Sequence, residues 1–89
     1  MVKITELRRS KSGVTYGIEG RVTTEDLVEI EMVCESALEN GLLPVLDLSA
    51  LTLVERGALN GFRDLNNCRI RMINPSSFLA QQLKKGGTQ

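Results

Sequence analysis

The chain has 89 residues, of which 42% are hydrophobic and 25% are charged. This length suits one domain and is too short for two, and the apolar share is sufficient for a hydrophobic core. Eleven basic residues balance eleven acidic ones, so no net charge attracts nucleic acid or an acidic membrane surface. We therefore expect a single globular domain over residues 1–89 that does not bind nucleic acid.

The charges are distributed unevenly along the chain. Seven acidic residues and no basic one lie between Val22 and Val54, whereas six basic residues and one acid lie between Arg56 and the end. This pattern fits either ordinary solvated faces or a molecule with one acidic and one basic end.

The N-terminal segment is charged and lacks a continuous apolar stretch, which predicts that there is no signal peptide. No apolar run elsewhere is long enough to span a bilayer. We therefore expect a cytoplasmic protein without direct membrane insertion. We expect Cys34 and Cys68 to be reduced, buried thiols in preference to a disulfide.

The first half of the chain reads as two strands and a helix. Residues 2–7 and residues 14–19 alternate between apolar and polar side chains around a turn-forming segment, which predicts a hairpin whose second strand ends at Gly20. The period then becomes helical over residues 23–40, where Thr23 is a suitable N-cap and acids occupy the first turn. An apolar stripe marks the buried side of this helix, and glutamates fill the opposite face.

A buried strand and a second helix follow. Residues 42–48 form a nearly continuous apolar run, which is typical of a strand covered on both faces. We predict a loop over residues 49–52 and a helix over residues 54–65, which ends at Asn66 and Asn67.

The last part of the chain reads as a strand over residues 68–73 and a short helix over residues 77–83. Pro75 suits the start of that helix, and residues 84–89 are expected to be a flexible tail. The order β-β-α-β-α-β-α predicts an α/β fold with a mixed β-sheet and helical crossovers.

The residue types argue against catalysis and cofactors. Histidine is absent from the sequence, which removes the commonest general base and the commonest metal ligand. Asp47 is the one acid in an apolar strand, and it either braces the adjoining loop or performs acid–base work. Gly57 and Gly61 form a GxxxG motif that either lets a helix pack closely against a sheet or contacts a ligand. We therefore expect no enzyme, no metal site and no cofactor.

One stretch is more specific than the rest. Residues 44–59, PVLDLSALTLVERGAL, resemble the signature of the STAS family, the anti-sigma factor antagonist domains. In that signature an apolar strand ends in Asp-Leu-Ser, and a short loop leads to Asp and a phosphorylatable Ser or Thr at the start of a helix. In an ungapped match Asp47 falls on the first Asp, Glu55 on the second Asp and Arg56 on the phosphoacceptor. Gly57 occupies a small-residue position.

The resemblance extends over about residues 14–83. Residues 20–23 resemble the family's turn before its first helix, with Thr23 in place of an acid. Residues 72–75 resemble the strand end that leads to the third helix, whereas the family's usual last strand and helix are absent. The resemblance implies a STAS-like fold with the helices mostly on one face of the sheet.

In this family, phosphorylation of the hydroxyl at the start of the second helix switches binding to a partner kinase or anti-sigma factor. Because Arg56 has no hydroxyl, the resemblance implies a regulatory protein–protein interaction module of bacterial signalling that lacks the usual Ser/Thr switch. Its partner would be an anti-sigma factor, a kinase-like regulator or another STAS-bearing protein. The expected partner-binding residues are Thr23, Ser49, Thr52, Glu55, Arg56, Gly57 and Asn60.

Several alternatives remain open at this stage. Arg56 either reaches a carboxylate or phosphate of the partner or is a solvated surface residue, and Ser49 or Thr52 could accept phosphate instead. STAS modules also occur as accessory subunits of membrane transport assemblies, where the partner is a transport ATPase or a permease. A sensor that binds a nucleotide or an anion near Arg56 is a function of a different class. A truncated sheet would also expose a strand edge and favour self-association.

Overall fold

The computed structural model of the protein describes residues 2–68 and 70–85. Its elements are β1 (Val2–Arg9), β2 (Gly13–Val22), α1 (Thr24–Glu39), β3 (Leu43–Asp47), β4 (Leu51–Val54), α2 (Arg56–Asn66), β5 (Arg71–Ile73) and α3 (Ser77–Lys85). β1 and β2 form an antiparallel hairpin, whereas β2 pairs in parallel with β3 and β4, and β3 pairs in parallel with β5. The sheet has the order β1-β2-β3-β5, with β4 attached to β2.

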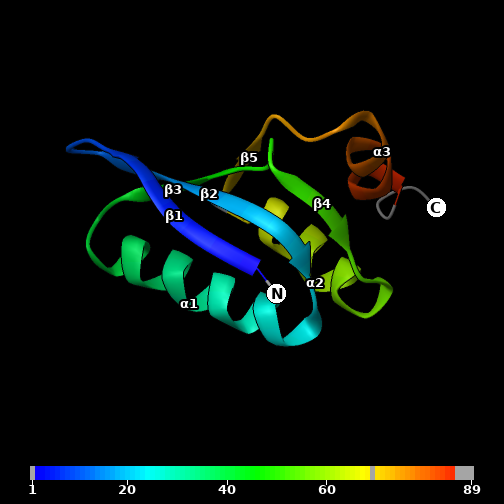
Figure 1. Ribbon diagram of the computed structural model, residues 1–89. Helices are drawn as coiled ribbons and strands as arrows, with labels where there is room; N and C mark the ends of the chain where they lie inside the picture. The colour runs from blue at the N-terminus through cyan, green and yellow to red at the C-terminus, as the bar shows by residue number, and fades with distance from the viewer. Residues whose placement is uncertain (1, 69, 86–89) are drawn as a thin grey trace.

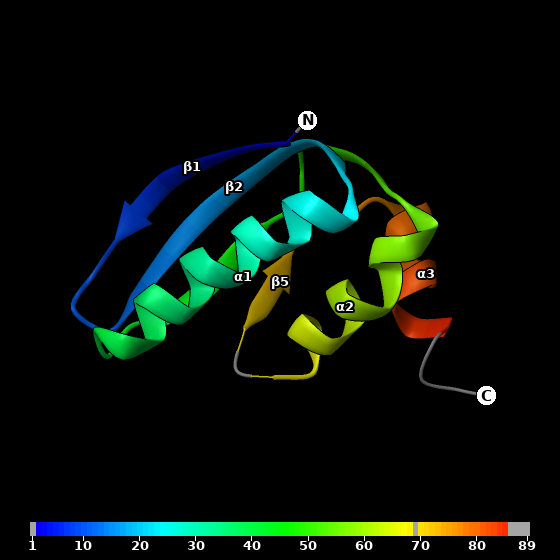
Figure 2. The ribbon, with the colours of Figure 1, turned by 90° about the horizontal axis from the view of Figure 1, so that it is seen from below.

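The helices lie mostly on one face of this sheet. α1 and α2 run beneath the strands in Figure 1 and in front of them in Figure 2, and α3 lies next to α2. The predicted α/β fold, a mixed sheet with helical crossovers and helices mostly on one face, is confirmed. No described helix is long and apolar enough to cross a membrane.

The segment predicted as a loop over residues 49–52 is partly a strand. β2 does not end at Gly20 but continues to Val22, and β4 pairs with this extension. Gly20 has a φ of 102°, a region that favours glycine, and the register of the β2–β4 pair shifts directly after it. This irregularity at Gly20 separates the first half of β2, which pairs with β3, from the end of β2, which pairs with β4. No local pattern in residues 49–52 indicates the pairing of β4 with β2.

The last elements also differ from their predicted bounds. The strand predicted over residues 68–73 is limited to β5, and Arg69 lies outside the described residues. The prediction of two buried thiols is wrong for Cys68, which is exposed in the turn after α2, whereas Cys34 is buried in α1. α3 continues to Lys85, two residues into the predicted tail, and residues 86–89 of that tail lie outside the described part.

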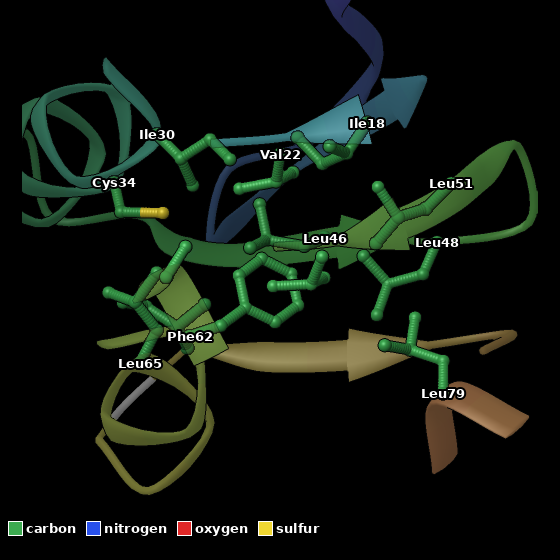
Figure 3. Close-up of a cluster of buried hydrophobic side chains, with 13 residues drawn as sticks. Ile18, Val22, Ile30, Cys34, Leu46, Leu48, Leu51, Phe62, Leu65 and Leu79 are labelled. Carbon is green, nitrogen blue, oxygen red and sulfur yellow. The ribbon is translucent and has the colours of Figure 1, made fainter. Parts of the chain in front are cut away.

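One main hydrophobic core lies between the sheet and the helices (Figure 3). Every layer contributes to it: Ile18, Val22, Leu46, Leu48, Leu51 and Val54 from the sheet and its loops, Ile30 and Cys34 from α1, Ala58, Phe62 and Leu65 from α2, and Leu79 from α3. Phe62 is completely buried, and burying one such side chain contributes about 1.5–3 kcal/mol. The core therefore holds α2 firmly beneath the sheet and leaves the first residue of α2 at the surface.

The two long helices approach each other closely at the GxxxG motif. A methyl group added to Gly61 would overlap the side chain of Leu27 in α1, and one added to Gly57 would touch Thr24. The motif therefore packs against a helix, not against the sheet as predicted. The close approach brings the beginnings of α1 and α2 together at one end of the molecule (Figure 2).

Candidate functional site

The candidate site lies where β4 leads into α2. Glu55 is the N-cap of α2 and Arg56 is its first helical residue. The backbone N–H of Glu55 donates to the carbonyl oxygen of Val22 at 2.9 Å, which ties the start of α2 to the end of β2. We refer to Glu55, Arg56, Gly57 and Asn60 as the α2 tip.

Arg56 carries the most distinctive chemistry of the α2 tip. Its side chain is exposed, and the first turn of α2 contains no acidic residue. Among the described residues, no carboxylate or hydrogen-bond acceptor lies within bonding distance of its guanidinium. A cation at the positive end of the helix dipole is mildly unfavourable. Both Arg56 and the N-terminus of α2 would therefore favour the binding of an external anionic group.

Glu55 interacts with the end of β2 and does not cap its own helix. Its Oε2 lies 3.0 Å from Nη2 of Arg21, and no side-chain capping hydrogen bond is formed at the start of α2. The side chains of Arg21 and Glu55 are 57% and 38% exposed, respectively, so the pair stabilises the fold by only about 0–1 kcal/mol. Its main effect is to neutralise Glu55, which leaves Arg56 as the net charge of the α2 tip.

Thr23 holds the beginning of α1 beside the α2 tip. Its hydroxyl accepts from the backbone N–H of Asp26 at 3.2 Å, and its own N–H donates to Asp26 Oδ2 at 3.0 Å. These reciprocal bonds form a capping box, and Thr23 is the N-cap of α1 as predicted. The hydrogen bond from the Thr23 backbone is the main reason why the pKa of Asp26 lies below its ordinary value.

Thr52 and Ser49 lie on β4 and in the loop before it. The Thr52 hydroxyl donates to the carbonyl oxygen of Gly20 at 2.8 Å, which fastens β4 to β2. The backbone N–H of Ser49 donates to Asp47 Oδ1 at 3.0 Å, and the side-chain amide of Asn74 approaches the same oxygen at 3.4 Å. These bonds, the Ser49 backbone bond first, lower the pKa of Asp47. Asp47 therefore braces its loop, the first of the two roles considered for it.

The predicted site residues do not all meet at one place. Thr23 adjoins the α2 tip through Val22, and Thr52 lies three residues before it, whereas Ser49 lines a separate hollow on the opposite face of the sheet with residues of β1 and β2. Asn60 lies one turn after Arg56, and its Oδ1 accepts from Nη1 of Arg63 at 3.1 Å.

Two arginines of this region were not expected from the sequence. Arg21 neutralises Glu55, and Arg63 connects α2 to α3 because its Nε donates to the carbonyl oxygen of Gln82 at 2.9 Å. Arg63 falls on the polar face of the predicted second helix, which was the only local signal for it. Arg21 lay beyond the predicted end of its strand, so no local pattern pointed to its role.

The acidic side chains of this region are held in hydrogen bonds. In residues 2–68 and 70–85, no three side chains of Cys, Asp or Glu come together as a metal site would require. Asp26 and Asp47 are held as hydrogen-bonded carboxylates with lowered pKa values, so they are weak proton acceptors at neutral pH. What the α2 tip offers is an exposed guanidinium on a rigid helix, with little side-chain bulk beside it at Gly57.

Comparison with known proteins places the fold. No protein-family model matches the chain, and no curated protein matches its sequence. An uncharacterised protein of the DUF3478 family from Shewanella loihica PV-4, described as having a SpoIIAA-like fold, superposes with a TM-score of 0.62 at 17% identity, over 96% of this chain and 77% of that one. The anti-sigma factor antagonist SpoIIAA in its unphosphorylated form superposes with a TM-score of 0.62 at 11% identity, over 89% of this chain and 79% of that one.

At such low identities the likeness concerns the fold, and it agrees with the resemblance found in residues 44–59. The mixed sheet with its helices matches the SpoIIAA-like fold. The chain therefore has the SpoIIAA-like fold.

Proposed function

We propose that this domain is a non-enzymatic regulatory module that binds a protein partner through the α2 tip. The observation that carries the proposal is Arg56, an exposed arginine at the first position of α2 without an acceptor among the described residues. The planar guanidinium suits two parallel hydrogen bonds to a carboxylate or a phosphate. The matching feature of the partner is thus an acidic group that reaches the beginning of α2.

The STAS-like fold supports this proposal because a protein of that fold is an anti-sigma factor antagonist. In the signature match, Arg56 takes the place of the phosphorylatable residue. A side chain that is permanently positive would replace a site whose charge is changed by phosphorylation. We propose that binding is constitutive, and that the partner is an anti-sigma factor or a kinase-like regulator.

The two hydroxyls considered as alternative phosphoacceptors, those of Thr52 and Ser49, make poor substitutes for the missing switch. Thr52 already donates its hydroxyl hydrogen to the carbonyl oxygen of Gly20, so phosphorylation would break this side-chain hydrogen bond between β4 and β2. Ser49 follows the ionised carboxylate of Asp47, which would repel a phosphate. These contacts favour a module without phosphorylation control.

The test is affinity capture from lysate of the source organism with the native protein, Arg56→Ala and the matched control Arg8→Ala as baits. Arg8 is an exposed arginine of β1, so the control removes the same charge from another element. We expect the native bait and Arg8→Ala to retain one regulator that Arg56→Ala loses. Titration of that purified regulator by calorimetry should then show affinity lowered about tenfold or more by Arg56→Ala.

Equal retention by all three baits would refute a role for Arg56 in docking. Retention of a transport ATPase or a permease would instead identify an accessory subunit of a transport assembly. If no protein is retained, the melting temperature is measured with a nucleotide or an anion added, since a ligand raises the melting temperature of the state it binds. An increase for the native domain but not for Arg56→Ala would favour the ligand sensor.

A further inference from the structure

The outward side of α1 carries apolar residues that the core does not use. Val28 and Met32 are 55% and 63% exposed and lie one turn apart on the helix. Next to Met32, an open hollow of about 350 Å³ is lined by Tyr16, Glu29, Met32, Val33 and Ser36. α1 is a long helix beneath β1 and β2, and no element in the described part of the chain covers its outward side (Figure 1). Val28 and Met32, with the hollow beside Met32, form a short apolar seam that is open to solvent.

The charges of α1 around this seam are all of one sign, whereas Arg9 of β1, which is paired with Glu6, lies close to Tyr16. α1 contains five glutamates and one aspartate but no basic residue, and its last turn has no base either. Both ion pairs among the described residues, Arg9 with Glu6 and Arg21 with Glu55, lie outside α1. We refer to Val28, Met32 and the exposed glutamates Glu25, Glu29, Glu35 and Glu39 as the α1 outer face.

This charge pattern is unfavourable for the helix itself. Glu25 and Glu29, and likewise Glu35 and Glu39, repel each other because residues four apart are neighbours on a helix surface. Glu39 also lies at the negative end of the helix dipole, where a base would be preferred. Packing of Ile30 against the sheet holds the helix in spite of this. A surface that breaks local rules without benefit to folding is where a binding function is expected.

We infer that the α1 outer face binds a basic amphipathic helix of a second protein partner. The apolar side chains of that helix would occupy the seam along Val28 and Met32 and the hollow beside Tyr16, in the manner of a helix laid into a groove. Its lysines and arginines would pair with Glu25 and Glu29 on one side of the seam and Glu35 on the other. The unfavourable charges within α1 are thereby neutralised on binding.

Charge decides against the simplest competing occupant. A second copy that docked through the same face would place two rows of glutamates against each other, which costs affinity. Small-molecule pockets bury most of their ligand, whereas this hollow is open along the side of the helix. The α1 outer face is also separate from the α2 tip, so the domain could hold two partners at once.

The test uses the ¹⁵N-labelled full chain and a designed peptide of about five helical turns with leucines on one face and lysines on its flanks. A control peptide has the same leucines, with glutamates in place of the lysines. We expect the basic peptide to shift the amide signals of Tyr16 and of the α1 residues, with little effect at Arg56. The affinity should fall steeply with added salt, because the pairs are exposed to solvent.

Variants then assign the contact. Val28→Ser with Met32→Ser should weaken peptide binding about tenfold, whereas Leu53→Ser, a similarly exposed residue of β4, should leave it unchanged. Glu25→Gln with Glu29→Gln should lower both the affinity and its salt dependence, and Glu19→Gln on β2 is the matched control. Well-dispersed amide signals of each variant in the absence of peptide show that the variant is folded.

Four results would overturn the inference. The first is equal binding of the basic and the acidic peptide, and the second is a set of shifts away from α1. The third is a dimer, measured by light scattering, that Met32→Ser dissociates, since a second copy would then be the occupant of this face. The fourth is absence of binding at millimolar peptide, because an affinity weaker than that is too low for a specific complex.

Discussion

Adding one methyl group at Gly61 tests how closely the two long helices must approach. A Cβ at this position would overlap the end of the Leu27 side chain, whereas a Cβ at Gly57 would only touch Thr24 at 3.4 Å, an ordinary contact distance. The two glycines lie one turn apart in the same helix. Gly57→Ala is therefore a matched control for Gly61→Ala, because both substitutions add the same group but only one creates a clash.

The expected energies follow from two opposing effects. Replacing glycine by alanine inside a helix favours folding by up to about 1 kcal/mol. Overpacking a filled interface costs about 1–3 kcal/mol, since the Leu27 side chain must change rotamer or the helices must move apart. Gly61→Ala should therefore destabilise the domain by roughly 0–2 kcal/mol. Gly57→Ala should stabilise it slightly, because only the first effect applies.

Urea unfolding followed by circular dichroism measures the difference. With an m-value of about 1 kcal/mol/M, the midpoints of the two variants should differ by about 1–3 M. Leu27→Ala removes the overlapping group, so the double variant Leu27→Ala/Gly61→Ala should be more stable than the sum of the single effects predicts. If Gly61→Ala is at least as stable as Gly57→Ala and the double variant is additive, close helix contact is not the reason for glycine at this position.

Three further predictions concern caps, acid stability and thiols. Thr23→Ala removes the capping box and should cost about 1 kcal/mol, seen as a melting temperature lowered by about 4–8 °C; Thr23→Ser should restore most of it. The pKa of Asp26 is lowered in the folded state, so its stabilisation is present above the unfolded pKa of about 3.9 and is lost as pH falls through the folded value. The difference in unfolding free energy between the native protein and Asp26→Asn should therefore shrink in strong acid, and a constant difference would contradict this. Burial raises the pKa of Cys34 to about 11, so mass spectrometry after native iodoacetamide treatment should find an adduct on exposed Cys68 and none on Cys34; equal labelling of both would disprove the burial of Cys34.

The parts of the fold that depend on near neighbours could be predicted from the sequence. The helical period and the Thr23 cap located α1, because a capping box involves residues only three positions apart. The apolar run before Asp47 identified the central strand β3, and the order of the signature residues pointed to the STAS-like fold that the comparisons confirm. The role of the α2 tip in docking stays a prediction.

The parts that depend on distant residues could not be predicted in this way. β4 was missed because its partner is the extension of β2 beyond Gly20, some thirty residues earlier, and a four-residue strand has too weak a pattern of its own. Cys68 is exposed where α2 ends, and its polar sequence neighbours Asn67 and Arg69 agree with that exposure.

The sequence by itself determined the period of each helix, the cap of α1, the central strand and the presence of an arginine where the resembling family has a phosphoacceptor. Only the tertiary structure decided that Arg21, which is 34 positions away, neutralises Glu55 and leaves Arg56 without a partner among the described residues. It also decided that the glutamates of α1 surround an exposed apolar seam. Local periodicity shows which residues share one face of an element, but which faces become covered depends on how all the elements pack against one core.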